Sequence, residues 1–212
     1  MAELRLEVLG AAVEQHAFAP AIALRLRVTE RSGAPVAAMA LRAQVRVEPQ
    51  LRPYTAQERD RLVEMFGPAF QWGDSLKPFT WTQLSTTIGR FEQSTDFELA
   101  LPCSYDVEVA GTPYLVALEQ GEIPLLLLFS GTLFGTGPAG MVVEPVPWHL
   151  EARFGLPVAT WRQAMDRFFP GTRWIRLSTE AADALGAFKA RQALPTWDQA
   201  VELLLKQAGE TP

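Results

Sequence analysis

The run Ile123-Pro-Leu-Leu-Leu-Leu-Phe-Ser-Gly-Thr-Leu-Phe-Gly135 carries no charge and decides between a membrane segment and a buried strand. It is well short of the roughly 20 apolar residues that a membrane-spanning helix needs. It also contains Pro124 and two glycines, and a turn-rich segment follows it. An uncharged run of this length, bounded by glycine and proline, predicts a strand covered on both faces and no membrane insertion.

Alternation of apolar and polar residues predicts three antiparallel strands in the first third of the chain. The residues expected to face inward are Leu4, Leu6 and Val8, then Ile22, Leu24, Leu26 and Val28, then Leu41, Ala43, Val45 and Val47. Further strands are expected over 81–91, 97–103, 123–134 and 141–148. The pattern favours a mainly β member of the α+β class, an antiparallel β-sandwich of about seven to nine strands.

Helix signals interrupt the strands once and then dominate the end of the chain. Thr55 and Glu58 have the spacing of a capping box, which predicts a short helix at about 55–66, and Pro113 opens a brief helix over 113–120. After Val158 the expected helices carry an apolar stripe of Trp161, Met165 and Phe168 or Phe169, a cap at Ser178 or Thr179, and a second capping box over 196–199. We therefore expect a sandwich domain over 1–155 and a small C-terminal helical unit over 156–212, packed on the sandwich.

Composition limits the classes of function. The 212 residues are 48% hydrophobic and 20% charged, with a net charge of −5, which argues against a nucleic-acid partner. The chain has a single cysteine, and its first residues interleave charges with leucines, unlike a signal peptide. A cytoplasmic location is the simplest interpretation.

The segment from Gly135 through Gly137 to Gly140 matches Gly-x-Gly-x-x-Gly, the spacing of a dinucleotide-binding loop. Such a loop must lead into a helix whose amides meet the pyrophosphate. The residues that follow, Met-Val-Val-Glu-Pro-Val-Pro-Trp148, are β-branched and broken by proline. We expect a hairpin loop here, and no nucleotide.

Few residues suggest catalysis or metal binding. Cys103, His16 and His149 are widely separated, without the spacing of a metal site or of a known cysteine nucleophile. A buried structural cysteine is the simpler interpretation of Cys103. No catalytic residue, metal ligand or cofactor is therefore predicted.

Six tryptophans are many for this length, and four of them fall from residue 148 onward. They either fill the seam between sandwich and helices or anchor a protein partner. In the last helix, Trp197, Val201, Leu204 and Leu205 form the candidate partner contact. The same stripe is as well explained by packing on the chain's own sandwich.

Five phrases together resemble one uncharacterised bacterial family, which is known only as a domain of unknown function. They are QVRVEP (44–49), PCSYDVEV (102–109), YLVALEQGEIP (114–124), LFSGTLF (128–134) and LPTWD (194–198). The resemblance covers nearly the whole chain and implies no fold or catalytic residue. It does imply a context, because members are often encoded beside nickel-iron hydrogenase subunits and their maturation factors. The family pattern also has an acidic residue where this chain has His149.

Two hypotheses of function follow. The first is a non-catalytic accessory protein that binds a hydrogenase subunit, a maturation factor or a second copy of itself. The second is an enzyme or small-ligand binder whose site is assembled in space around Cys103, His16 or His149. The first is favoured, since no constellation of titratable residues is visible in the sequence.

Overall fold

The computed structural model describes residues 3–103, 111–137, 140–172, 175 and 177–210. The chain separates into two compact units, Met1–Thr172 and Arg173–Pro212, and each is described by itself. The boundary expected from sequence, between residues 155 and 156, lies earlier than this division.

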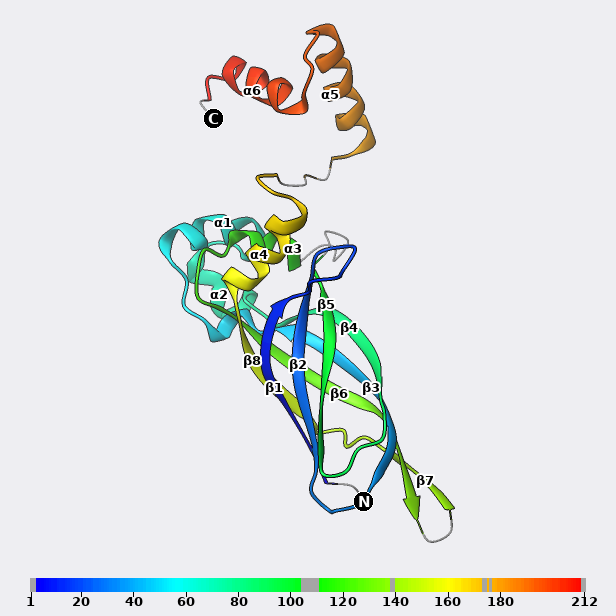
Figure 1. Cartoon of the computed structure of the whole chain (residues 1–212). Coiled ribbons are helices and arrows are strands. Elements are labelled where there is room, and N and C mark those ends of the chain that lie inside the picture. Colours follow the sequence, from blue (N-terminus) through cyan, green and yellow to red (C-terminus); the bar gives the residue numbers. More distant parts are fainter. Residues whose placement is uncertain (1–2, 104–110, 138–139, 173–174, 176, 211–212) are drawn as a thin grey trace. The chain divides into compact units, whose positions relative to one another are not determined.

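The first unit contains two antiparallel sheets (Figure 1). The three-stranded sheet has the order β1-β2-β5 and consists of β1 (Leu4–Val13), β2 (Ala21–Glu30) and β5 (Ser94–Pro102). The second sheet has five strands, namely β3 (Val36–Val47), β4 (Phe79–Ile88), β6 (Glu122–Gly137), β7 (Gly140–Pro145) and β8 (Glu151–Pro157). Within the described residues the chain thus has eight strands, and the expected mainly β sandwich is confirmed.

The core lies between the sheets, where the predicted inward positions meet. Leu24, Leu26 and Val28 of β2 are fully buried, as are Val45 of β3 and Leu127 of β6. All five belong to one hydrophobic cluster. The alternation in sequence therefore predicted the inward faces of β2 and β3 correctly, because successive side chains of a strand point to opposite sides.

Strand β6 is the centre of the second sheet, and it differs in part from the prediction. Its first half pairs with β8, its second half pairs with β7, and β3 lies along its other edge. The prediction that both faces of β6 are covered is correct around Leu126, which is buried between Arg46 and Arg153 of the neighbouring strands. The prediction is wrong at Ser130, whose side chain is exposed. The residue paired with Ser130 on β3, Arg42, is polar as well.

Short helices gather at one end of the two sheets (Figure 1). They are the 3-10 turns η1 (Pro49–Leu51) and η2 (Ala69–Gln71) and the α-helices α1 (Ala56–Phe66), α2 (Trp72–Ser75), α3 (Gly111–Ala117) and α4 (Val158–Phe168). The capping box of Thr55 and Glu58 is confirmed at the start of α1. Gly67 ends that helix with a φ of 73°, a conformation that glycine adopts readily.

Helix α4 packs against β1, β2 and β8. Its stripe is buried as predicted, with Trp161 and Met165 in the core cluster and Phe169 packed against it. Strand β8, which precedes α4, was not predicted, because it is short and Gly155 interrupts its apolar pattern. Both elements belong to the first compact unit.

The second unit contains α5 (Thr179–Arg191) and α6 (Trp197–Gln207). Both predicted N-caps are confirmed: Ser178 Oγ accepts from the Ala181 amide, and Thr196 Oγ1 accepts from the Gln199 amide, each at 3.2 Å. Among the described contacts, no bond from the Gln199 side chain completes the capping box expected over 196–199. Ala200 is the one buried residue that the structure describes in these two helices. Among the described residues, no helix combines the length and apolar character that crossing a membrane requires.

Candidate functional site

Helix α6 brings the predicted contact residues onto one face. At 100° per residue, Trp197, Val201, Leu204 and Leu205 fall within one stripe along the helix. Trp197 is 54% exposed, Val201 40% and Leu204 37%, while Leu205 is half-buried. We call these four residues the α6 stripe. Its exposed area is apolar, which is the character of a protein contact surface.

The indole ring of Trp197 packs against helix α5. A Cβ atom placed on Gly186 would lie 3.6 Å from the Cη2 atom of Trp197, so the indole ring rests where α5 has no side chain. The Lys189 ammonium lies 5.4 Å from the centre of the same ring, a cation–π distance. The ring is therefore oriented by α5 while about half of it remains exposed.

The other tryptophans divide between core and surface. Trp81 and Trp161 are buried, and Trp72 is half-buried with its indole N–H donating to the Gly67 carbonyl. Trp148 is 91% exposed. Trp174 lies outside the described residues. Trp81 and Trp161 are therefore core residues, whereas an anchoring role for the exposed Trp148 and Trp197 stays a prediction.

Cys103 is buried at the end of β5, where its amide donates to the Pro20 carbonyl. Burial raises the pKa of its thiol to about 12. A thiol with this pKa is protonated at neutral pH and is therefore a poor nucleophile. The expectation of a structural cysteine fits this environment.

We predict that native Cys103 reacts with a disulfide reagent such as DTNB at least ~100-fold more slowly than the same thiol in urea, because thiolate is scarce and access is blocked. The measurement is the rate of thionitrobenzoate release at neutral pH, with free cysteine as the reference thiol. Equal rates in native and unfolded protein would contradict this environment.

The structure does not join Cys103 to either histidine. His16 is exposed in the connection between β1 and β2, which also contains Pro20. His149 is exposed in the connection between β7 and β8, where its ring packs edge-on against Trp148. Among the described residues, no three His, Cys, Asp or Glu side chains are grouped so as to hold a metal ion. A site around these three residues stays a prediction without a geometric argument.

The segment Gly135–Gly140 leads into strand β7 instead of a helix. Gly137 pairs with Gly140 across the hairpin, and Thr136 pairs with Met141. The predicted hairpin is confirmed, although residues 138–139 lie outside the described residues. No helix N-terminus follows the glycines, so the geometry required by a pyrophosphate loop is missing.

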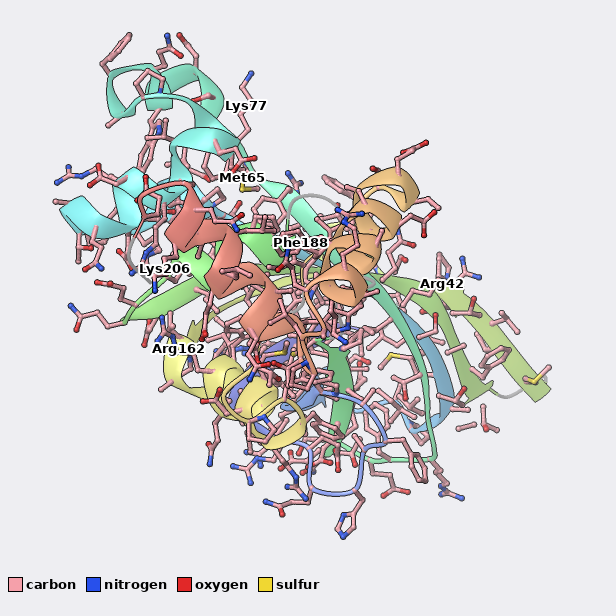
Figure 2. All side chains as sticks on the ribbon, turned by 90° about the horizontal axis from the view of Figure 1, so that it is seen from above. Arg42, Met65, Lys77, Arg162, Phe188 and Lys206 are labelled. Carbon is pink, nitrogen blue, oxygen red and sulfur yellow. The ribbon has the colours of Figure 1, made fainter. Side chains whose placement is uncertain are left out.

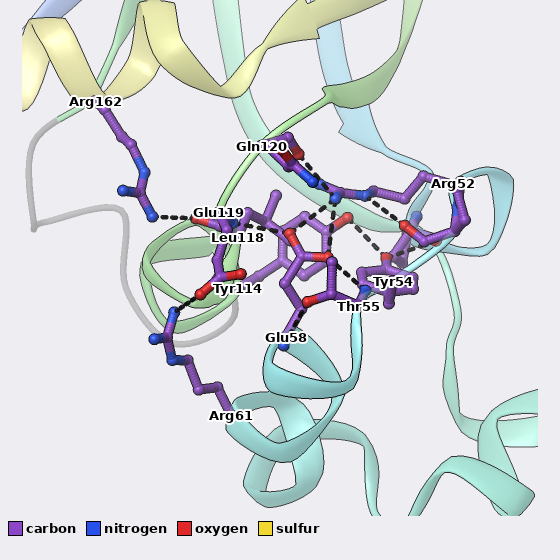
Figure 3. Close-up of polar contacts among 12 residues, drawn as sticks. Arg52, Tyr54, Thr55, Glu58, Arg61, Tyr114, Leu118, Glu119, Gln120 and Arg162 are labelled. Carbon is purple, nitrogen blue, oxygen red and sulfur yellow. Dashed lines mark hydrogen bonds and ion pairs between the residues drawn. The ribbon is translucent and has the colours of Figure 1, made fainter.

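A polar cluster that the sequence did not reveal surrounds the start of α1 (Figure 3). Glu58 is fully buried, and its carboxylate accepts from the Thr55 amide at 3.0 Å and the Glu119 amide at 2.8 Å. Arg52 Nη2 donates to both Glu58 oxygens, at 2.9 and 3.2 Å, and to the Gln120 carbonyl at 3.0 Å. We call this set the Arg52–Glu58 cluster. It ties α1 to the segment after α3.

Two tyrosines border the Arg52–Glu58 cluster. The Tyr54 hydroxyl donates to the Pro49 carbonyl at 2.6 Å and lies 2.9 Å from the Tyr114 hydroxyl. Burial raises the pKa of Tyr54, as do the neighbouring Tyr114 and Glu58, and burial raises the pKa of Tyr114 to about 12. Both phenols are therefore protonated at neutral pH. The arrangement suits a structural clasp better than an acid–base site, because neither phenol titrates near pH 7.

The pKa of the Glu58 carboxyl lies below its ordinary value. Burial acts to raise this pKa, but hydrogen bonds from the Glu119 and Thr55 amides and the charge of Arg52 outweigh the effect of burial. Within the described part of the chain, Arg52 Nη1 is a buried donor without a partner. The capping-box spacing of Thr55 and Glu58 was the one sequence signal of the Arg52–Glu58 cluster. The contacts of Glu58 with Arg52 and with the Glu119 amide could be seen only in the folded structure.

The sequence profile of a family of unknown function (DUF6084) matches residues 1–212. The chain belongs to this family. The match confirms the resemblance to a family of unknown function, whereas the association with hydrogenase genes rests on the resemblance alone. The family description names no activity or partner.

No curated protein matches the chain. Among solved structures, a β-glucosidase from Kluyveromyces marxianus is similar at 11% identity and a TM-score of 0.30. The alignment covers 74% of this chain and 15% of that enzyme's chain. A TM-score this low carries no argument about fold or activity.

Proposed function

We propose that this protein is a non-catalytic, cytoplasmic accessory protein that binds a protein partner through the α6 stripe. The observation that carries the proposal is the joint exposure of Trp197, Val201 and Leu204 on one face of a capped helix. Tryptophan and large aliphatic side chains in such an arrangement are typical anchors of a helix that lies in a partner's groove.

Two properties of the second unit support this proposal. Ala200 is its one buried residue among those described in α5 and α6, so these helices have little core of their own. A pair of helices this small gains stability when its apolar side is covered. The caps at Ser178 and Thr196 nevertheless define both helices, so the stripe is presented on a regular helix.

The partner's chemistry follows from the stripe. An apolar groove or helix face is required, because the stripe carries no charge. The resemblance to a family encoded near hydrogenase genes makes a nickel-iron hydrogenase subunit or maturation factor the first candidate. A second copy of the chain is the alternative partner, and a single measurement of mass separates the two.

We predict that changing both Leu204 and Leu205 to Lys leaves the protein folded and abolishes partner binding, because two charges would have to be buried in an apolar contact. The measurement is capture of partners from a native extract by the tagged full chain, with quantitative mass spectrometry for hydrogenase subunits and maturation factors. Light scattering reports the mass of the isolated protein.

Gln199→Lys is the matched control, since Gln199 lies on the side of α6 opposite the stripe and is exposed. It is expected to keep the parent's partners and mass. A fall of several kcal/mol in stability of the double variant would show that the leucines are buried within this chain and would overturn the proposal. Unchanged capture and mass in the double variant would overturn it as well.

A further inference from the structure

Several arginines of the two sheets have an acidic partner, including Arg153 of the five-stranded sheet, which pairs with Glu48 at 2.6 Å. On the three-stranded sheet, Arg27 Nε and Nη2 donate to the Asp96 carboxylate at 2.6 and 2.9 Å. On the same sheet, Arg5 pairs with Glu7 at 3.2 Å. Acids on the same strand or on an adjacent strand therefore neutralise these cations, as is common on a solvent-exposed sheet.

On the five-stranded sheet, Arg42 of β3 has hydroxyl neighbours instead. Its cross-strand partners are Ser85 of β4 and Ser130 of β6. No ion pair or side-chain hydrogen bond joins Arg42 to any residue that the structure describes. Figure 2 shows Arg42 well apart from Arg162, so it lies away from the buried contacts of α4.

The rows of side chains on either side of Arg42 are also uncharged, and most of them are polar. Ala40 is flanked by Thr87 and Thr132, and Gln44 by Gln83 and Leu128. The outward side chains around the arginine are therefore mostly hydroxyls and amides, which both donate and accept hydrogen bonds.

Two adjoining open hollows, of about 500 and 700 Å³, lie over this part of the sheet. Both are lined by Arg42, Ser85 and Ser130. None of the described residues that line them is acidic. Volumes of roughly 300–1,000 Å³ are those of small-molecule sites. The hollows thus offer room for a compound larger than a simple ion, around one unpaired cation.

We propose that this face binds a small polyhydroxylated oxyanion, the chemical class of sugar phosphates and sugar acids. The guanidinium of Arg42 pairs with the anionic group, since its planar donors match the oxygens of a carboxylate or a phosphate. The side chains of Ser85, Ser130 and Gln44 exchange hydrogen bonds with the ligand's hydroxyl groups. This inference is independent of the α6 stripe and its partner.

Weak binding is expected, because the hollows are open and the whole chain carries a net charge of −5. A dissociation constant of about 0.1–1 mM is the range to search. The experiment is a titration of the full chain, followed by the backbone amide shifts in NMR, with four probes: glucose 6-phosphate, glucuronate, inorganic phosphate and glucose. Saturable shifts are expected in the segments 40–44, 83–87 and 128–132.

Arg42→Gln is expected to weaken binding of the anionic sugars at least ~10-fold, the usual effect of losing a charged hydrogen bond. The matched control is Arg25→Gln, an exposed arginine on β2 that faces Glu98 across the other sheet, and it is expected to bind like the parent. Circular dichroism checks that both variants are folded. Glucose is expected to bind at least ~10-fold more weakly than the anionic sugars.

The four probes distinguish a phosphate ligand from a carboxylate ligand. Saturable binding of glucose 6-phosphate alone assigns a phosphate ligand, binding of glucuronate alone assigns a carboxylate, and binding of both supports the shared class. The proposal is overturned if neither anionic sugar binds, if Arg42→Gln binds as tightly as Arg25→Gln, or if inorganic phosphate binds as tightly as glucose 6-phosphate.

Discussion

Replacing Gly131 by Ala is expected to cost the sandwich at least about 4 kcal/mol, which is a large share of the stability of a typical domain. A Cβ atom at this position would lie 2.0 Å from the Ala40 carbonyl oxygen and 3.2 Å from Leu41 Cα. These are backbone atoms of β3, the neighbouring strand, so they move only if the pairing of β3 and β6 is disturbed. The φ of 148° adds strain for any residue other than glycine. Urea unfolding followed by circular dichroism measures the loss.

Two other glycine variants separate the close approach from the backbone strain. Gly135→Ala, in the same strand, would place its Cβ at an ordinary 3.7 Å from the Pro35 carbonyl oxygen, and little change is expected. Gly33→Ala meets no atom within 4 Å but has a φ of 81°, so a loss of about 1 kcal/mol is expected from strain alone. If Gly131→Ala is no worse than Gly33→Ala, the close packing of β3 on β6 is not what this position requires.

Replacing Glu58 by Ala is expected to cost about 3–5 kcal/mol, because it leaves a buried cation uncompensated. The side chain of Glu58 is 0% exposed and that of its partner Arg52 is 8% exposed. The variant also removes the acceptor of the Thr55 and Glu119 amides. Thermal and urea unfolding of the full chain measure the loss.

Glu58→Gln and Glu92→Gln test the origin of that loss. Glutamine is compatible with a capping box, so Glu58→Gln removes mainly the charge opposite Arg52 and is expected to cost less than Glu58→Ala. Glu92 pairs with Arg90 on the surface, with side chains 68% and 73% exposed, and its replacement is expected to change stability by less than about 1 kcal/mol. Equal losses of stability on replacing Glu58 and Glu92 would show that the buried Arg52–Glu58 pair stabilises the protein no more than a surface pair does.

The pH dependence of stability is a second test of the contribution of the Glu58 charge. Its pKa in the folded protein lies below the ordinary value of 4.5, so on acidification the unfolded chain takes up this proton first. The stabilisation is therefore fully present above pH 4.5 and is lost as the pH falls from 4.5 through the folded-state pKa. The pKa of Glu30 is lowered as well, so both the parent and Glu58→Gln lose stability in acid. The difference between them is expected to shrink below pH 4.5; a constant difference would contradict the role of the charge.

Local patterns in the sequence were sufficient for much of the secondary structure. The strands around Leu24 and Val45 follow from a period of two, and the starts of α1, α5 and α6 follow from hydroxyl side chains that cap amides three residues later. Both signals depend on residues that are close in the chain, so no knowledge of the fold is required. The stripe on α6 was predicted for the same reason, since helix geometry alone places Trp197, Val201 and Leu204 together.

Only the tertiary structure decided which distant segments meet. The pairing of β6 with β8 and then β7, the approach of Gly131 to Ala40, and the hydroxyl neighbours of Arg42 all depend on strand register. Register is set by the whole core and its connections, and no short segment encodes it. The contact of Glu58 with the Glu119 amide joins residues 61 apart, so the chain must fold before that carboxylate has its partner. The sequence by itself therefore determined most of the elements and the inward faces of the first strands, while long-range packing determined β8, the buried ion pair and the unpaired arginine.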